Sequence, residues 1–240
     1  RLPGPYVMPM AINEAIQMAK QAGTGTITVR RSQHIASLAA YLSLATEQGM
    51  MVSLMCSTPG QRAVAPFGAK QAVYSPNPFA VGVPSSGDPI LLDISLSMTA
   101  AGKVRQAKAN QQKLPYNALV TAQGEWTDDP ETFFSDPSSA IGPLGGELLG
   151  YKGYGLTLFS ELWTMALAQY GRNQGQEEGD ANCVWVQVID PSAFGEQKAF
   201  ITQVDELIRD TLAAKPIAAD NPVRIPGYQA LARKRQQLEK

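Results

Sequence analysis

Two side chains suited to proton or charge chemistry follow apolar segments of the chain. His34 is the sole histidine among 240 residues, and imidazole is the side chain whose unperturbed pKa lies nearest neutrality. It follows the alternating segment 26–30, so it is either a proton donor or a surface or helix-capping residue. Asp93 ends the apolar run 90–93, where an ionised carboxylate is costly unless it is paired or hydrogen-bonded. It could accept from ribose hydroxyls, orient a catalytic group, or cap the helix that follows.

A glycine-rich stretch containing one lysine precedes a helical pattern. Residues 145–155 read Gly-Gly-Glu-Leu-Leu-Gly-Tyr-Lys-Gly-Tyr-Gly. Glycines let the backbone approach a ligand, and a helix N-terminus presents free N–H groups to an anion. Gly146 and Lys152 therefore form a candidate phosphate site, with Lys103 as a further cation. The stretch matches neither the dinucleotide pattern G-x-G-x-x-G nor the P-loop, and a helix entry without a ligand stays open.

Composition excludes several other classes of function. Lys plus Arg number 20 against 21 Asp plus Glu, which is not the basic footprint of a nucleic-acid binder. One histidine and two cysteines cannot build a His-based metal cluster, so we expect no metal. Cys56 and Cys183 lie in apolar runs and are expected to be buried free thiols, which favours a reducing, cytoplasmic location. No apolar run reaches the ~20 residues that span a bilayer, so no membrane partner is expected.

Helix-like and strand-like patterns alternate along the first quarter of the chain. A helix starting near Pro9, a strand at 26–30, a helix at 35–48 and a strand at 50–56 predict a mixed sheet covered by helices, an α/β fold. Prolines crowd segment 58–89 and exclude long helices there. Further elements are expected at 90–93 (strand), 98–109 and 156–170 (helices), 183–189 (strand), 200–212 (helix) and the C-terminus (helix).

Short motifs, taken in order, resemble the malate/L-lactate dehydrogenase-like family of NAD(P)-dependent oxidoreductases. This family includes sulfolactate and ureidoglycolate dehydrogenases, diketogulonate reductase and cyclic-imine carboxylate reductases. The matching segments cover nearly the whole chain and are Arg31-Ser32-Gln33-His34, Ala65-Pro66-Phe67-Gly68, Asn77-Pro78-Phe79-Ala80 with Pro84, Asp93-Ile94-Ser95 through Ala101-Gly102-Lys103, Gly124, Asp129-Pro130, Pro143-Leu144-Gly145-Gly146, Lys152-Gly153-Tyr154-Gly155-Leu156 and Arg224-Ile225-Pro226-Gly227.

The resemblance implies a non-Rossmann nicotinamide-binding fold, a homodimer, and a small-molecule substrate that is a 2-oxo or 2-hydroxy acid or a cyclic imino acid. The cofactor would be NAD or NADP. By position, His34 would contact or protonate the substrate, and Thr58 would lie on the substrate side. Asp93 would be catalytic and, with its neighbours Leu92 and Ile94, would line the cofactor site. Lys103, Gly146 and Lys152 would lie near the cofactor, in a cofactor-binding region 57–150. Residues 1–56 and 151–240 would form the substrate and dimerisation domain.

The chain also departs from the family pattern. Members usually carry an earlier Ser-His-Gly segment with a central histidine, whereas this sequence begins at Arg1 and has no second histidine. The usual His-Phe-Gly reads His34-Ile35-Ala36. Two alternatives therefore stay open: a truncated, catalytically weak or inactive member that keeps the dimeric scaffold, and a phosphate-binding module that uses the glycine stretch alone.

Overall fold

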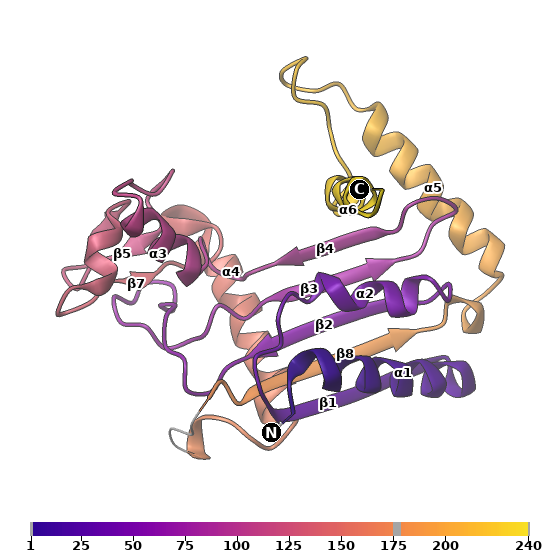
Figure 1. The fold of residues 1–240 in the computed structure, drawn as a ribbon, viewed down its shortest axis with the longest axis horizontal. Coiled ribbons are helices and arrows are strands. Elements are labelled where there is room, and N and C mark those ends of the chain that lie inside the picture. The colour runs from indigo at the N-terminus through magenta and orange to yellow at the C-terminus, as the bar shows by residue number, and fades with distance from the viewer. Residues whose placement is uncertain (1, 175–178, 240) are drawn as a thin grey trace.

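Two antiparallel sheets organise the chain in the computed structural model, which describes residues 2–174 and 179–239 (Figure 1). The larger sheet holds five strands in the order β1-β8-β2-β3-β4, and every neighbouring pair is antiparallel rather than mixed as expected. Its strands are β1 (Thr24–Ser32), β8 (Asn182–Ile189), β2 (Met51–Ser57), β3 (Phe79–Val83) and β4 (Ile90–Ile94). The expected α/β class, a sheet covered by helices, is confirmed.

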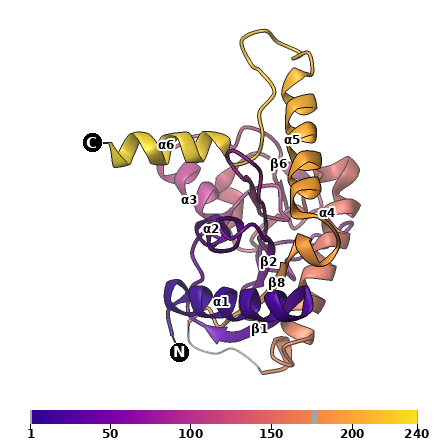
Figure 2. The same cartoon turned by 90° about the vertical axis from the view of Figure 1, so that its right-hand side faces the viewer.

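Two helices cover one face of the large sheet. Helices α1 (Gly4–Ala22) and α2 (Ala39–Thr46) lie side by side on it, as Figures 1 and 2 show. Met8, Ile12 and Ile16 recur at helical spacing on α1, and all three are fully buried. They belong to the same core cluster as the inward-facing side chains of β2 and β8. Burial of this apolar stripe determines which face of α1 packs against the large sheet.

Helix α4 (Gly146–Glu161) lies on the opposite face and continues into a π-helical turn, Leu162–Ala166 (Figure 2). Small and polar residues face the protein, among them the buried Gly153, Thr157 and Ser160. Large apolar side chains point outward instead: Leu148 is 84% exposed and Leu156 is 50% exposed. An exposed apolar surface of this kind usually marks an interaction site.

A smaller lobe stands beside one end of the large sheet (Figure 1). It contains the sheet β6-β5-β7 and helix α3. The bounds are β5 (Leu119–Val120), β6 (Trp126–Thr127), β7 (Ala140–Ile141), α3 (Ala101–Ala109) and a 3-10 turn, Pro130–Phe134. The core of this lobe is separate from the main one and is built on Val104, Leu119 and Ile141.

The C-terminal helices α5 (Gln197–Ala213) and α6 (Tyr228–Leu238) bury none of their residues. Two short 3-10 turns, Arg172–Gln174 and Pro191–Ala193, flank β8 along the chain. Asp88, on the loop before β4, ties α6 down: its carboxylate pairs with Arg235 and its carbonyl oxygen accepts from Tyr228 Oη at 3.2 Å. None of the described helices is long and apolar enough to cross a membrane.

Several sequence expectations need correction in detail. Helix α1 begins at Gly4, so Pro9 lies inside it rather than at its start. The helix expected at 35–48 is shorter, because Ala36 has a left-handed φ of 62° and helical geometry begins only at Ala39. Residues 146–155 are helical rather than a loop. Strands β3 and β4 lie inside region 57–150 and belong to the large sheet; the assignment of that region to the cofactor stays a prediction.

Candidate active site

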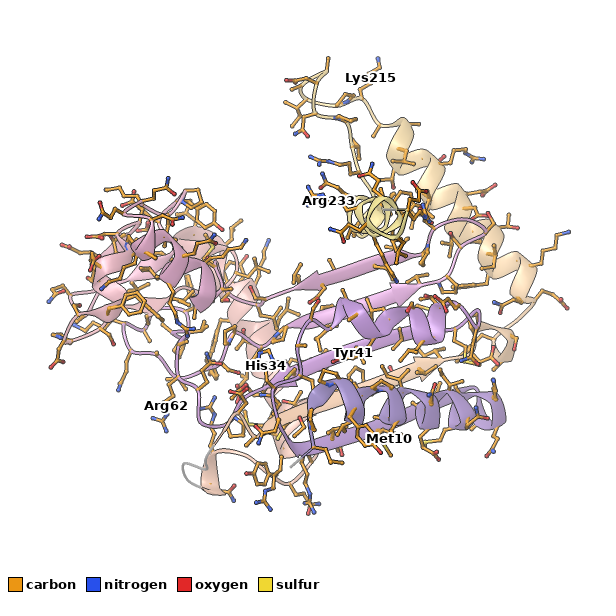
Figure 3. The ribbon with its side chains drawn as sticks, in the orientation of Figure 1. Met10, His34, Tyr41, Arg62, Lys215 and Arg233 are labelled. Carbon is orange, nitrogen blue, oxygen red and sulfur yellow. The ribbon has the colours of Figure 1, made fainter. Side chains whose placement is uncertain are left out.

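His34 lies on an extended loop between β1 and α2, at the end of the large sheet that faces the smaller lobe (Figure 3). The next residue, Ile35, is only 4% exposed and anchors the loop in the core. The Ala36 N–H donates to His34 Nδ1 at 3.1 Å. In the neutral imidazole the proton then resides on Nε2. Since the side chain is exposed, Nε2–H is directed to a ligand or to solvent.

Asp93 ends β4 and reaches across to the same loop. Its Oδ2 accepts from Ser37 Oγ at 3.0 Å and from the Ala39 N–H at 2.8 Å. The Asp93 carboxylate on β4 therefore caps the N-terminus of α2. The helix dipole favours negative charge at that end. The expected cap on the helix that follows Asp93 is therefore corrected, because the helix capped is α2, which precedes Asp93 in the chain. The contact also brings Asp93 to the loop that carries His34.

The outer edge of β4 presents backbone groups beside Asp93. The Leu91 N–H donates outward, to Pro226 O at 3.0 Å. In an antiparallel strand the N–H groups alternate in direction, so the Asp93 N–H faces outward too. No backbone acceptor for it is found among residues 2–174 and 179–239. Ile94, also at this edge, is 36% exposed, and Leu92 is half-buried.

Thr58 follows β2 and is joined to the His34 loop through Asn182. The Asn182 Nδ2 donates to Thr58 Oγ1 at 2.8 Å, and Asn182 Oδ1 accepts from the Ile35 N–H at 2.9 Å. The structure thus brings Thr58 and the His34 loop together, as the sequence predicts for two substrate-side residues. Asn182 itself was missed. Its signal was a polar residue heading an otherwise apolar strand.

A buried polar cluster supports Thr58 from the other side. Ser75 Oγ accepts from the Thr58 N–H at 3.0 Å and donates to Asn77 Oδ1. Asn77 Nδ2 donates to Glu161 Oε1 at 3.0 Å, and Arg172 binds Glu161 Oε2 at 2.9 Å. Burial raises the pKa of the Glu161 carboxyl, while Asn77 and Arg172 oppose the rise. Sequence analysis missed this cluster, although Glu161 is a carboxylate within an apolar helical pattern.

Lys103 lies in the smaller lobe, beside a cavity of about 350 Å³ that Lys113, Tyr116 and Thr99 also line. Lys113 is paired with Asp128 at 2.9 Å. No contact between Lys103 and either His34 or Asp93 is found in the described part of the chain. The cavity is nevertheless cationic and hydroxyl-lined, which suits a phosphate group.

Gly146 is the first residue of α4, and the turn before it packs on the segment after β4. The Leu144 N–H donates to Leu96 O at 3.0 Å, and the Met98 N–H donates to Gly142 O at 2.9 Å. The turn is therefore close in the fold to the segment that follows Asp93. Lys152 is further along α4 and is exposed, with its ammonium 5.8 Å from the centre of the Tyr151 ring.

These groups fit a nicotinamide dinucleotide by their chemistry. The open edge of β4 offers a backbone donor at Asp93 beside the apolar Ile94, and a carboxamide-bearing ring needs such a combination. The Gly146 helix start and the Lys103 cavity offer the positive potential that phosphates require. Over the residues that the structure describes, no group of three or more His, Cys, Asp or Glu could hold a metal ion.

Comparison with known proteins identifies the family of the chain. The chain belongs to the malate/L-lactate dehydrogenase family, whose model matches residues 1–240. Malate dehydrogenase of Pyrococcus abyssi is 30% identical over 216 residues, which are 86% of this chain and 58% of the relative. Ureidoglycolate dehydrogenase (NAD(+)) of Escherichia coli O157:H7 is 26% identical over 245 residues, 97% of this chain and 66% of that protein.

A solved structure extends the likeness to the fold. Delta1-piperideine-2-carboxylate reductase of Pseudomonas syringae superposes with a TM-score of 0.83 at 26% identity, covering 97% of this chain and 68% of that one. The non-Rossmann fold expected from the resemblance is thereby confirmed. The chain spans about three fifths of the length of the curated relatives it matches, between 58% and 63% for the first two.

Proposed function

We propose that this chain carries the active site of a nicotinamide-dependent oxidoreductase acting on a small 2-oxo or 2-hydroxy acid or a cyclic imino acid. The observation that carries the proposal is the convergence of His34, Thr58 and the open β4 edge at Asp93 around one loop. Family membership supports the reaction class, and both substrate types occur among the relatives, as malate dehydrogenase and delta1-piperideine-2-carboxylate reductase.

The proposed site residues have two kinds of role, binding of substrate and cofactor and assistance of proton transfer. A bound reduced nicotinamide, as NADH or NADPH, supplies the hydride that reduces the C=O or C=N carbon. His34 Nε2–H polarises the substrate oxygen or nitrogen by donating a hydrogen bond to it. To transfer a proton, His34 must be the imidazolium, whose Nδ1–H replaces the hydrogen bond from the Ala36 N–H, and loss of the Nε2 proton then leaves the neutral ring. Thr58 Oγ–H binds the substrate. Leu92, Asp93 and Ile94 hold the nicotinamide end, while Lys103, Gly146 and Lys152 hold the phosphates.

Fluorescence titration with NADH and NADPH, followed by an oxidation assay with a panel of 2-oxo acids and a cyclic imine, tests this proposal. We expect saturable binding, turnover with at least one substrate, and loss of turnover in His34→Gln. ADP-ribose should compete less well than the intact dinucleotide. Equal competition would instead support a site for phosphates alone, and binding without turnover would support an inactive member.

We also propose that two copies pair through the outward face of α4. The support is the row of exposed apolar side chains on α4 and the turn after it, namely Leu148, Leu149, Leu156, Phe159, Leu162 and Leu167. A contiguous row of exposed apolar side chains is typical of an interaction surface, whereas single exposed apolar residues are common on monomers.

The two cysteines, which are free and buried, also support a reducing, cytoplasmic setting.

A further inference from the structure

Asn182 lies between Thr58 and the loop that carries His34, and its side chain hydrogen-bonds to both. It begins β8 and is 4% exposed. We infer that Asn182 is a positioning residue: it locks Thr58 and the His34 loop into one unit, so that both present their donors to the same ligand. The inference rests on the proposed function and adds a specific residue to it.

The two hydrogen bonds of Asn182 fix the orientation of its own amide and of the Thr58 hydroxyl. Because its Oδ1 accepts from the Ile35 N–H, its Nδ2 must face Thr58. Because Thr58 Oγ1 accepts from that Nδ2, the Thr58 hydroxyl proton must point elsewhere. No acceptor for that proton is found in the part of the chain that the structure describes. The Thr58 hydroxyl proton is therefore available to a ligand oxygen or to water.

The His34 side of the unit is equally constrained. The Ile35 N–H is buried and has Asn182 as its acceptor, while the Ile35 carbonyl accepts from Tyr41 Oη at 2.7 Å. Both backbone groups of the residue next to His34 are thus fixed by side chains. The Ala36 N–H bond to His34 Nδ1 then sets the ring, so the position of His34 depends on Asn182 through a single residue.

The far side of Thr58 is held by the buried cluster described above. Its N–H is bound by Ser75, which Asn77 and Glu161 hold in turn. With its backbone fixed from this side, Thr58 cannot follow Asn182 if that side chain changes. One amide group therefore links Thr58 directly to the His34 loop, because it supplies a donor and an acceptor at once.

Two substitutions of Asn182 test the acceptor role of Oδ1 and the donor role of Nδ2 separately. Asn182→Ala removes both bonds, whereas Asn182→Asp keeps an acceptor for Ile35 but offers no donor to Thr58. Asn13→Ala, at an exposed position on α1, is the matched control. The readouts are amide hydrogen exchange at Ile35, the NMR signals of the imidazole (unambiguous, because the chain has one histidine) and steady-state kinetics.

We expect Asn182→Ala to speed Ile35 exchange, shift the imidazole signals, and lower kcat/KM at least about tenfold, since about tenfold corresponds to one lost hydrogen bond and this variant loses two. The loss should fall mainly on kcat, with nicotinamide affinity unchanged. Asn182→Asp should keep slow Ile35 exchange but lose kcat/KM. Combined with Thr58→Val, Asn182→Ala should add less than its full single-variant loss, because only the share that acts through the His34 loop remains. Asn13→Ala should match the wild type in all three readouts.

The outcomes keep this inference apart from the proposed function. If the wild type shows no turnover with any substrate, the proposed function fails, and Ile35 exchange and the imidazole signals still report whether Asn182 holds the loop. Wild-type exchange and unshifted imidazole signals in Asn182→Ala would overturn the inference. So would full kcat/KM in that variant, or losses that multiply when Thr58→Val is added.

Discussion

Two glycines in α4, two residues apart, are expected to respond oppositely to the same substitution. A Cβ added at Gly153 would lie 2.2 Å from Leu144 O and 2.6 Å from Leu144 N, whereas one added at Gly155 would meet nothing within 4 Å. Replacing glycine by alanine inside a helix stabilises it by about 1 kcal/mol. At Gly155 that gain should appear in full. At Gly153 the helix and the Leu144 backbone must first move apart.

The cost at Gly153 follows from what must move. Leu144 presents backbone atoms, which cannot rotate away, and overpacking of this kind costs roughly 1–3 kcal/mol. After the helix gain, Gly153→Ala should be destabilised by up to about 2 kcal/mol. Each kcal/mol shifts Tm by roughly 2–4 °C in a chain of this size. Gly153→Ala should therefore melt below the wild type and Gly155→Ala above it.

Thermal and urea unfolding of both variants, over a range of protein concentrations, measures this difference. Concentration matters because Gly155 lies on the outward side of α4, where an effect that grows with concentration would report a second copy. Displacing Leu144 also disturbs the turn before Gly146, so Gly153→Ala should bind NADH more weakly while Gly155→Ala does not. A Gly153→Ala protein as stable as the wild type would refute the reasoning.

Four further outcomes are expected. Burial raises the pKa of Cys183 to about 11, so iodoacetamide at pH 8 should label it only after unfolding; labelling of the native protein would contradict its burial. His34→Gln should lower kcat about 100-fold with nicotinamide affinity retained, and a matching loss of affinity would place His34 in cofactor binding instead. The raised pKa of Glu161 means that its folded form holds its proton more tightly. The free energy of unfolding of the wild type, relative to Glu161→Gln, should therefore fall as pH rises above about 4.3; a rise would contradict the sign. Leu156→Glu should convert a dimer to a monomer in light scattering, and an unchanged mass would exclude the α4 face.

Sequence patterns predicted the elements well where one apolar period ran without interruption. Residues 183–189 and 200–212 fall within β8 and α5 as observed. Patterns failed where backbone conformation was set by distant contacts. The start of α2 depends on Asp93, fifty-four residues away in the chain, and on the left-handed Ala36. Apolar spacing carries no information about either feature.

The glycine-rich stretch shows why residue type alone left alternatives open. Two of its glycines, Gly150 and Gly153, are buried against Pro143, Phe67 and the Leu144 backbone, so close packing suffices to explain them. Gly145 and Gly146 have φ of 100° and 62°, which the turn into α4 requires. Contact of Gly146 and Lys152 with phosphate stays a prediction. A sequence shows that glycine is needed, but the neighbouring backbone shows why.

The site residues found by sequence and those found only in the structure differ in one physical respect. His34, Asp93 and Lys103 carry charge or titrate, so their chemistry is visible in the residue type. Asn182 acts through the direction of two hydrogen bonds, and direction exists only once β8 has placed it between Thr58 and Ile35. The position of β8 in the sheet places the Asn182 amide where it can hydrogen-bond to both Thr58 and the Ile35 backbone. The alignment of β8 with β1 and β2 therefore places Asn182 between these two groups, at a point that residue type alone does not reveal.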